Sequence, residues 1–103
     1  MLEPSDLSIS VDDAHGEQVV HLAGELDVAA AGFLVRTLAQ TTGSPVVVDL
    51  AGLTFLDAAG ISALLTARRR IEEQGRRLVV RNPSPWIVRV IQLAGATSAV
   101  FAE

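Results

Sequence analysis

The sequence contains no cysteine, no lysine and no tyrosine, and only four of its residues are aromatic. Without cysteine the chain has no disulfide and no thiolate nucleophile or ligand. The scarcity of aromatic side chains argues against a platform on which nucleic-acid bases stack. Twelve Asp and Glu residues outnumber eight Arg residues, which gives a formal net charge of −4. Such a chain lacks the basic field that non-specific nucleic-acid binding needs, so nucleic acid is not an expected partner.

Long hydrophobic runs are also absent. Half of the 103 residues are hydrophobic, yet no uninterrupted apolar run approaches the roughly 20 residues of a membrane-spanning helix. No basic segment followed by an apolar one opens the chain, so we expect no secretory signal and a cytoplasmic protein. The length suits one domain over residues 1–103, in which residues 1–5 show no periodic pattern and are expected to be a loose terminus.

Hydrophobic periodicity divides the chain into short segments. Alternating or uninterrupted apolar residues predict strands at residues 7–12, 18–23, 46–48, 78–80 and 97–101. Apolar residues at helical spacing predict helices at residues 28–40, 58–74 and 86–94. Turns are expected at residues 13–16, 24–27 and 82–83. The order β-β-α-β-α-β-α-β predicts an α/β fold, with a mixed β-sheet and helices packed on the sheet.

Each predicted helix has residues suited to its ends. Asp27, Asp57 and Ser84 stand where side-chain oxygens cap the first free N–H groups of a helix. Gly75 follows the second helix as its C′ residue. Arginines gather around that helix end, at positions 68, 69, 70, 76 and 77. Because positive charge complements a helix C-terminus, we predict that this cluster is a solvated helix end.

The stretch of residues 46–65 organises the rest of the chain. Its three valines predict a buried strand that Asp49 ends, after which Gly52 provides the joint of a turn and residues 53–56 form an apolar loop. Asp57 then caps a helix beginning at Ala58. The first N–H groups of a helix have no partner inside it and carry partial positive charge. Any function is therefore expected at this helix start.

The residues at the helix start are small, since Ala58, Ala59 and Gly60 follow Asp57 directly. They would let the backbone of a partner, or an anionic group, approach the free N–H groups closely. A purely structural explanation stands beside this one. Asp57 can be a cap that contributes about 1 kcal/mol, and Gly60 can relieve crowding where the helix meets the sheet. The residues alone leave both interpretations open.

No set of residues predicts an enzyme. His15 and His21 lack companions at metal-ligand spacing and are expected to be a turn residue and a strand-face residue. A triad of Ser62, His21 and Asp57 can be assembled on paper, but no serine stands at a strained strand-to-helix elbow. The glycines do not form a phosphate-binding loop. We therefore expect no catalytic residue, no metal site and no cofactor.

Three segments closely resemble the STAS domain family. They are GELD at residues 24–27, VDL at residues 48–50 and LTFLDAAGI at residues 53–61. The likeness covers nearly the whole chain, and the length resembles free-standing bacterial anti-sigma-factor antagonists more than the cytoplasmic domains of sulfate transporters. The resemblance implies a STAS-like fold and a non-catalytic protein-interaction module. Such a module binds an anti-sigma factor of the serine-kinase type and so releases a sigma factor.

The resemblance also implies which residues meet the partner. The expected interface is Glu25, Asp27, Asp57, Ala58, Ala59, Gly60 and Ile61. In the family, the kinase phosphorylates a Ser or Thr directly after the motif Asp, and that position here is Ala58. Because Ala58 has no hydroxyl, we expect no phosphorylation there and an antagonist that is always competent to bind. Thr54 and Ser62 carry the nearest hydroxyls.

Two other functions remain open. STAS proteins without a phosphoacceptor resemble accessory or scaffolding subunits of a transporter ATPase or of a stress-signalling complex. A small-molecule binder or enzyme is the third possibility, supported only by the open helix start. In each case we expect a monomer or weak dimer that does not insert into membranes.

Overall fold

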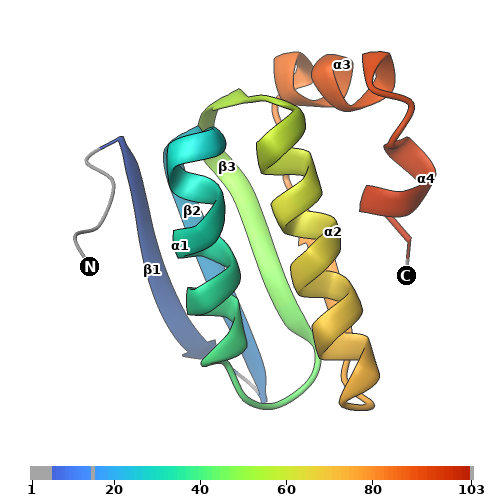
Figure 1. Ribbon diagram of the computed structural model, residues 1–103. Coiled ribbons are helices and arrows are strands. Elements are labelled where there is room, and N and C mark those ends of the chain that lie inside the picture. The colour runs from blue at the N-terminus through green and yellow to red at the C-terminus, as the bar shows by residue number, and fades with distance from the viewer. Residues whose placement is uncertain (1–5, 15, 103) are drawn as a thin grey trace.

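The computed structural model describes residues 6–14 and 16–102. Its centre is a four-stranded sheet with the spatial order β1-β2-β3-β4 (Figure 1). The strands are β1 (Leu7–Ala14), β2 (Glu17–Leu26), β3 (Val46–Leu56) and β4 (Leu78–Arg81). β1 runs antiparallel to β2, whereas β2, β3 and β4 are mutually parallel. The sheet is therefore mixed, as the element order predicted.

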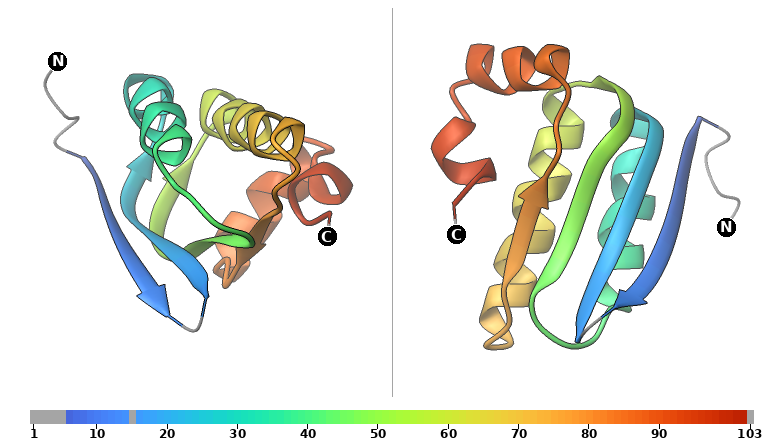
Figure 2. Two further views of the ribbon diagram at one scale, coloured as in Figure 1. Left: turned by 90° about the horizontal axis from the view of Figure 1, so that it is seen from below. Right: turned by 180° about the vertical axis from the view of Figure 1, so that it is seen from behind.

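Two long helices lie side by side on one face of this sheet (Figure 2). They are α1 (Val28–Ala39) and α2 (Ala58–Glu73), and both begin at the same end of the molecule. A shorter helix, α3 (Pro85–Leu93), lies across that end, and α4 (Thr97–Val100) follows it. The predicted α/β class and the packing of helices on the sheet are confirmed.

The core lies between the sheet and the two long helices. Val20 and Leu22 of β2, and Val46 and Val48 of β3, have at most 1% of their surface exposed. The helices contribute apolar residues at helical spacing, namely Ala30, Leu34, Leu38, Ile61, Leu64 and Ile71. Since each fully buried Val, Leu or Ile side chain contributes roughly 1.5–3 kcal/mol, this layer holds the two helices in place.

The predicted ends of β2 and β3 are wrong, because both strands continue beyond them. β2 extends through Gly24 to Leu26, and its pairing with β3 shifts register between His21 and Ala23 and again between Gly24 and Glu25. Gly24 has a φ of +99°, and a Cβ there would collide with the carbonyl oxygen of Asp6. The glycine thus marks an irregularity inside the strand and not a turn that ends it.

β3 likewise continues through Asp49 to Leu56, so residues 53–56 are strand and not loop. The Asp49 carboxylate accepts the N–H of Ala51 at 3.0 Å, which satisfies a backbone donor where the ladder is irregular. Gly52 lies against β2, and a Cβ there would be 2.9 Å from the carbonyl oxygen of Leu22. Gly52 therefore permits close packing of two strands, which a sequence pattern does not separate from a turn.

The last predicted strand, at residues 97–101, is wrong as well. The structure forms the short helix α4 there, with Val100 completely buried. Arg68 of α2 donates hydrogen bonds to the carbonyl oxygens of Ala99, Ala102 and Leu78. Carbonyls that a guanidinium satisfies need no neighbouring strand, so the segment closes as a helical turn.

The same contacts correct the prediction for the arginine cluster. Arg68 is only 6% exposed and belongs to the interior, whereas Arg69, Arg70 and Arg77 are exposed as predicted. Its aliphatic stem suits burial, while its planar donors reach three carbonyls. A run of three consecutive arginines gave no sign of which one faces inward.

The predicted helix ends are confirmed. The side chains of Asp27, Asp57 and Ser84 accept N–H groups in the first turns of α1, α2 and α3, and Gly75 follows α2 with a φ of +75°. The first hairpin is tighter than predicted, since Ala14 pairs with Glu17. The predictions for residues 1–5 and for His15 fall outside the described residues. Among the described residues, no helix is both long and apolar enough to cross a membrane.

Candidate functional site

Two neighbouring strands deliver two helix starts to the same place. Leu26 pairs with Leu56 in the parallel ladder between β2 and β3, and the N–H of Asp57 donates to the carbonyl oxygen of Leu26 at 3.4 Å. The next residue of each strand, Asp27 and Asp57, caps a helix. The starts of α1 and α2 therefore lie side by side, which brings the expected interface residues together.

The caps themselves are well formed. One carboxylate oxygen of Asp57 accepts the N–H of Gly60 at 2.9 Å, and one of Asp27 accepts the N–H of Ala30 at 3.1 Å. Both Asp residues have extended backbones, as N-cap residues do. Each carboxylate also places negative charge at the positive end of a helix dipole, which stabilises the helix start.

The expected interface residues differ in exposure. Glu25 and Ala58 are exposed, and Asp27, Asp57 and Ala59 are half-buried. Gly60 and Ile61 are buried and belong to the contact between α2 and the rest of the core. The accessible part of the interface is therefore formed by the other five residues.

Gly60 has a structural explanation. A Cβ at this position would be 2.4 Å from the carbonyl oxygen of Leu26 and 2.7 Å from the Cδ1 atom of Leu56. Those distances are too short for any side chain, so the first turn of α2 can meet β2 only through a glycine. This outcome favours the interpretation that Gly60 relieves crowding where helix and sheet meet.

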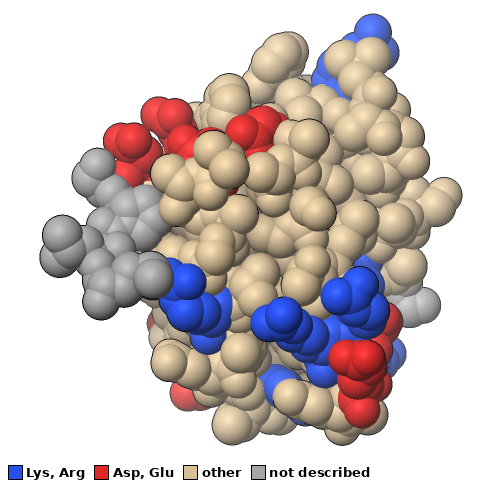
Figure 3. Space-filling view, viewed as in Figure 1, with Lys and Arg blue, Asp and Glu red and all other residues tan. Residues whose placement is uncertain are grey.

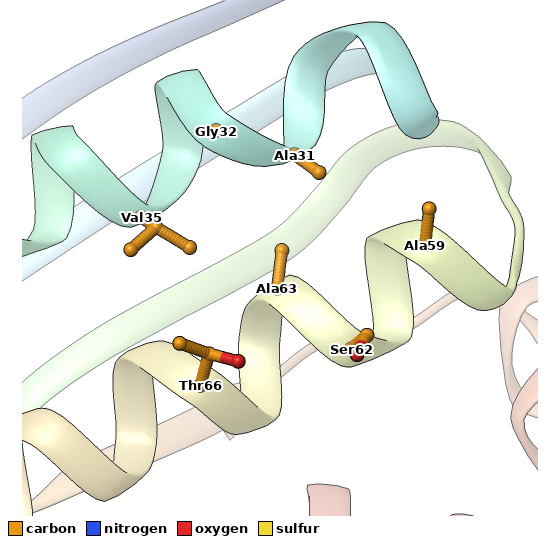
Figure 4. Close-up of a pocket in the computed structure, with 7 residues that line it drawn as sticks. All are labelled: Ala31, Gly32, Val35, Ala59, Ser62, Ala63 and Thr66. Atoms are coloured by element: carbon orange, nitrogen blue, oxygen red, sulfur yellow. The ribbon is translucent and has the colours of Figure 1, made fainter.

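Two shallow hollows flank the first turns of α2. A groove of about 340 Å³ separates α1 from α2 and is lined by Ala31, Gly32, Val35, Ala59, Ser62, Ala63 and Thr66 (Figure 4). A second hollow of about 260 Å³ lies on the other side, lined by Ala58, Ile61, Ser62, Leu65, Ala94 and Ala96. Ser62 lines both. Alanines predominate in the lining of both hollows, and Ile61 and Leu65 add larger apolar side chains to the second. This face can therefore receive apolar groups from another protein.

Charge is distributed unevenly over the same face. Figure 3 shows carboxylates near the starts of α1 and α2, arginines together with further carboxylates toward the other ends, and a broad uncharged area between. Arg36 and Arg70 are the basic residues in the last turns of the two helices, and Glu72 and Glu73 end α2. An acidic end opposite an end of mixed charge would help to fix the direction in which a partner binds.

The two nearest hydroxyls occupy different surroundings. Thr54 lies on β3, not in a loop, and its Oγ1 donates to the carbonyl oxygen of Gly24 at 3.1 Å. Ser62 is exposed on α2 between the two hollows. Neither stands directly after the capping Asp57, where Ala58 is found.

A polar cluster on the other face of the sheet was missed by sequence reasoning. His21 of β2 lies between two carboxylates, with Nδ1 2.7 Å from Asp49 and Nε2 2.9 Å from Asp12. Asn82 donates to the remaining oxygen of Asp49 at 3.2 Å. The alternation of Asp12 and His21 with apolar neighbours indicates one shared face, but nothing in the sequence revealed that Asp49 joins them.

The pKa values of His21 and Asp49 in this cluster both differ from their ordinary values. Hydrogen bonds to Asp49 and Asp12 raise the pKa of His21 above its ordinary value, against the smaller effect of desolvation. Burial works to raise the pKa of Asp49, but hydrogen bonds from Ala51, His21 and Asn82 outweigh it and lower that pKa. The cluster therefore favours a charged imidazolium between two carboxylates.

The triad of Ser62, His21 and Asp57 is not assembled. His21 faces away from the core and both its ring nitrogens are engaged by Asp12 and Asp49, whereas Ser62 and Asp57 belong to the start of α2. Among the residues that the structure describes, no group of three or more His, Asp or Glu side chains is arranged to hold a metal ion.

The chain belongs to the STAS domain family, because the family model described as "Mlab, STAS domain" matches residues 9–100. A relative, the anti-sigma F factor antagonist of Lysinibacillus sphaericus, is 32% identical over 81 residues that cover 75% of this chain and 69% of the relative. This likeness also supports the resemblance to single-domain antagonists.

Solved structures agree with this family. An anti-sigma factor antagonist from Mycobacterium paratuberculosis superimposes with a TM-score of 0.74 at 25% identity, covering 98% of this chain and 88% of its own. The anti-sigma factor antagonist SpoIIAA in its unphosphorylated form gives a TM-score of 0.69 at 25% identity, covering 85% and 81% of the two chains. The mixed α/β fold is thus that of SpoIIAA-like STAS domains.

Proposed function

We propose that this protein is an anti-sigma-factor antagonist that binds an anti-sigma factor of the serine-kinase type and thereby releases a sigma factor. The single observation that carries the proposal is the open start of α2, where Ala58 and Ala59 follow the capping Asp57 between two apolar hollows. The names of the relatives supply the class of partner. The action is one of binding without catalysis, and its place is the cytoplasm.

The proposed contact uses groups that the fold leaves available. Glu25 and Ala58 are exposed, and Asp27, Asp57 and Ala59 are partly so. The Asp57 carboxylate accepts the N–H of Gly60, while the N–H groups of Ala58 and Ala59 have no partner inside the helix and only small side chains stand near them. A partner can place backbone or a polar group over this turn while its apolar side chains fill the hollows on either side.

Because of Ala58, the proposed antagonist is always competent to bind its partner. A phosphoryl group at this position would add about −1.5 to −2 charges beside Asp57, in the middle of the contact. Like-charge repulsion and desolvation would then oppose binding. With no hydroxyl at residue 58 or residue 59, the surface keeps one charge state, and control must lie with the partner or with the amount of antagonist.

Affinity purification of the tagged chain from its host tests the proposal. We expect an anti-sigma factor with a kinase domain to be recovered in about equal amount, and purified partner to bind in titration calorimetry with a stoichiometry of one. A tagged Ala59→Arg variant is the matched control, because a long side chain there would fill the groove between α1 and α2. Equal recovery by both chains would place the contact elsewhere.

A second function has an observation in its favour. The absence of a hydroxyl at Ala58 and Ala59 also suits an accessory or scaffolding subunit of a transporter ATPase or stress-signalling complex, which needs no phosphorylation switch. The same purification separates the two possibilities. Recovery of an ATPase of the ABC type, with no anti-sigma factor, would replace the first proposal with the second.

A further inference from the structure

Exposed apolar side chains gather at one end of the molecule. Of the large hydrophobic residues that the structure describes as exposed, Val28, Phe55, Trp86 and Leu93 lie where α1 and α2 begin and α3 crosses, whereas Val11 lies on β1. Their exposed fractions run from 42% for Phe55 to 76% for Val28. Large apolar groups grouped in this way mark a surface that another molecule covers.

These residues form two patches on either side of the start of α2. The first, called the rim patch, consists of Glu25, Val28 and Phe55, with Glu25 paired to Phe55 across β2 and β3. The second, called the α3 patch, consists of Trp86, Arg89 and Leu93. Spacings of three and four residues place these on one side of α3, while Ile87 and Ile91 on its other side are completely buried. The buried side anchors the helix and fixes the α3 patch outward.

The two patches carry opposite charges without internal partners. Glu25 and Arg89 are both exposed, and among the described residues neither side chain has a hydrogen-bond or ion-pair partner. The wider sequence has the same polarity. Residues 1–35 contain Asp and Glu but no Arg, whereas residues 74–102 contain Arg but no Asp or Glu. Each patch thus has two large apolar side chains and one free charge, of opposite sign to the other.

We propose that the occupant of this end is a second copy of the same chain. The α3 patch of one copy lies on the rim patch of the other, and the reverse contact forms at the same time about a two-fold axis. Arg89 then faces the partner copy's Glu25, and Trp86 and Leu93 pack near its Val28 and Phe55. Closed two-fold contacts of this kind stop at the dimer and do not propagate.

An anionic membrane fits this end less well. The carboxylates of Glu25, Asp27 and Asp57 lie at the same end as α3, so a flat lipid surface that met Trp86 would also meet them. A second copy avoids this conflict because it offers arginine to the acidic side and carboxylate to the basic side. The patches are small beside standard interfaces of about 1,200–2,000 Å², so the dimer is weak and depends on concentration.

The dimer itself does not depend on the proposed function. Its effect on partner binding does, because that effect assumes that the partner binds at the start of α2. The start of α2 lies between the two patches, so a dimer would cover Ala58 and Ala59. Partner binding and self-association would then exclude each other. The dimer would hold spare antagonist in an inactive form, which compensates for the missing phosphorylation site.

Sedimentation equilibrium of the purified chain, from low micromolar to near-millimolar concentration, tests the dimer without any partner. Trp86 is the only tryptophan, so its emission should shift to shorter wavelength over the same range. We expect Arg89→Glu and Glu25→Arg each to weaken the dimer by about tenfold or more, an effect near 1.4 kcal/mol. The combined variant should recover most of the loss, because it restores opposite charges.

Arg69→Glu is the matched control, since it makes the same charge change at an exposed site toward the far end of α2. It should leave the dimer unchanged. A monomer at every concentration, or an Arg89→Glu chain that dimerises as tightly as the original, would overturn the proposal. A chain that stays monomeric but loses its cellular partner on Trp86→Ala would also overturn it, and would assign the α3 patch to that partner while leaving the proposed function intact.

Discussion

Residue 58 decides whether the surface can be switched. Ala58 stands directly after the capping Asp57 and is exposed, so a side chain added there would point from the first turn of α2 into solvent or into a partner. A hydroxyl would be accessible to a kinase, and a carboxylate would imitate the charge of a phosphate. The chain therefore offers a clean position at which to introduce regulation.

We expect Ala58→Ser to accept phosphate from a cognate kinase and Ala58→Glu to weaken partner binding by about tenfold or more, since the added charge lies beside Asp57. Mass spectrometry after incubation with kinase and ATP, and titration calorimetry, would measure the two effects. Ala39→Glu, at the exposed end of α1, is the control. Stoichiometric phosphate on residues 54–62 of the unchanged chain would contradict the idea of a fixed charge state.

Gly60 is expected to be needed for folding. Gly60→Ala would place a Cβ 2.4 Å from the carbonyl oxygen of Leu26, and overpacking of this kind costs about 1–3 kcal/mol. Urea denaturation would measure the loss in the free energy of unfolding. Gly32→Ala is the matched control, since the nearest obstacle to its Cβ is the end of the flexible Arg36 side chain at 3.1 Å. It should be neutral or stabilising, because alanine favours a helix by up to about 1 kcal/mol over glycine. Equal stability losses would refute this explanation of Gly60.

At the scale of elements, one side chain joins the last segment to the rest of the fold. Arg68 of α2 reaches the carbonyl oxygens of Leu78, the first residue of β4, and of Ala99 and Ala102 around α4. The exposed residues Thr97, Ser98 and Ala99 offer little apolar surface of their own. Beyond the burial of Val100 and the packing of Ala96 and Phe101 against the core, the position of α4 therefore depends on this guanidinium.

Arg68→Met should release α4 while leaving the sheet intact. Hydrogen bonds made by a charged group contribute about 1.5–3 kcal/mol, and methionine replaces the stem but not the donors. Hydrogen exchange should accelerate at residues 97–102 more than in β2 or β3. Arg70→Met, an exposed neighbour in the last turn of α2, should leave exchange unchanged. Uniform acceleration across the chain would show that Arg68 supports the whole core and not one element.

The link between β1, β2 and β3 should depend on pH. The pKa of His21 is raised above 6.5 by Asp49 and Asp12. At a pH between 6.5 and this raised pKa, the imidazole therefore keeps its proton in the folded state but has mostly lost it in the unfolded state. The corresponding stability is fully present below pH 6.5 and is lost as the pH rises through the folded pKa. His21→Gln should flatten this dependence in urea denaturation. A decline of the same slope in the variant would assign it to other groups.

At the scale of the molecule, local patterns predicted the layout but not the irregularities. The caps at Asp27, Asp57 and Ser84 were predictable because each side chain bonds N–H groups within a few residues of itself. Gly24 and Gly52 were wrongly predicted as turn residues. Glycine is needed at both positions because backbone that is distant in the sequence packs closely against them. The burial of Arg68 and the meeting of His21 with Asp49 likewise depend on contacts that exist only after folding.

The candidate site shows the same division. The position of the start of α2 and its small residues could be inferred from the order Asp57, Ala58, Ala59. The hollows on either side could not, since they arise where α1 and α3 come to lie. The presence of both patches at one end could not be inferred either, since the fold brings there residues more than sixty positions apart, such as Glu25 and Arg89.

The pairing of Leu26 with Leu56 makes recognition inseparable from the integrity of the core. If the pairing of β2 with β3 shifted by one residue, the buried leucines would turn outward. The start of α1 would also shift along the sheet relative to the start of α2. No partly ordered form could therefore display a distorted but usable contact area. Variants weakened anywhere in the sheet should lose partner binding in proportion to the unfolded fraction, with the affinity of the remaining folded molecules unaltered.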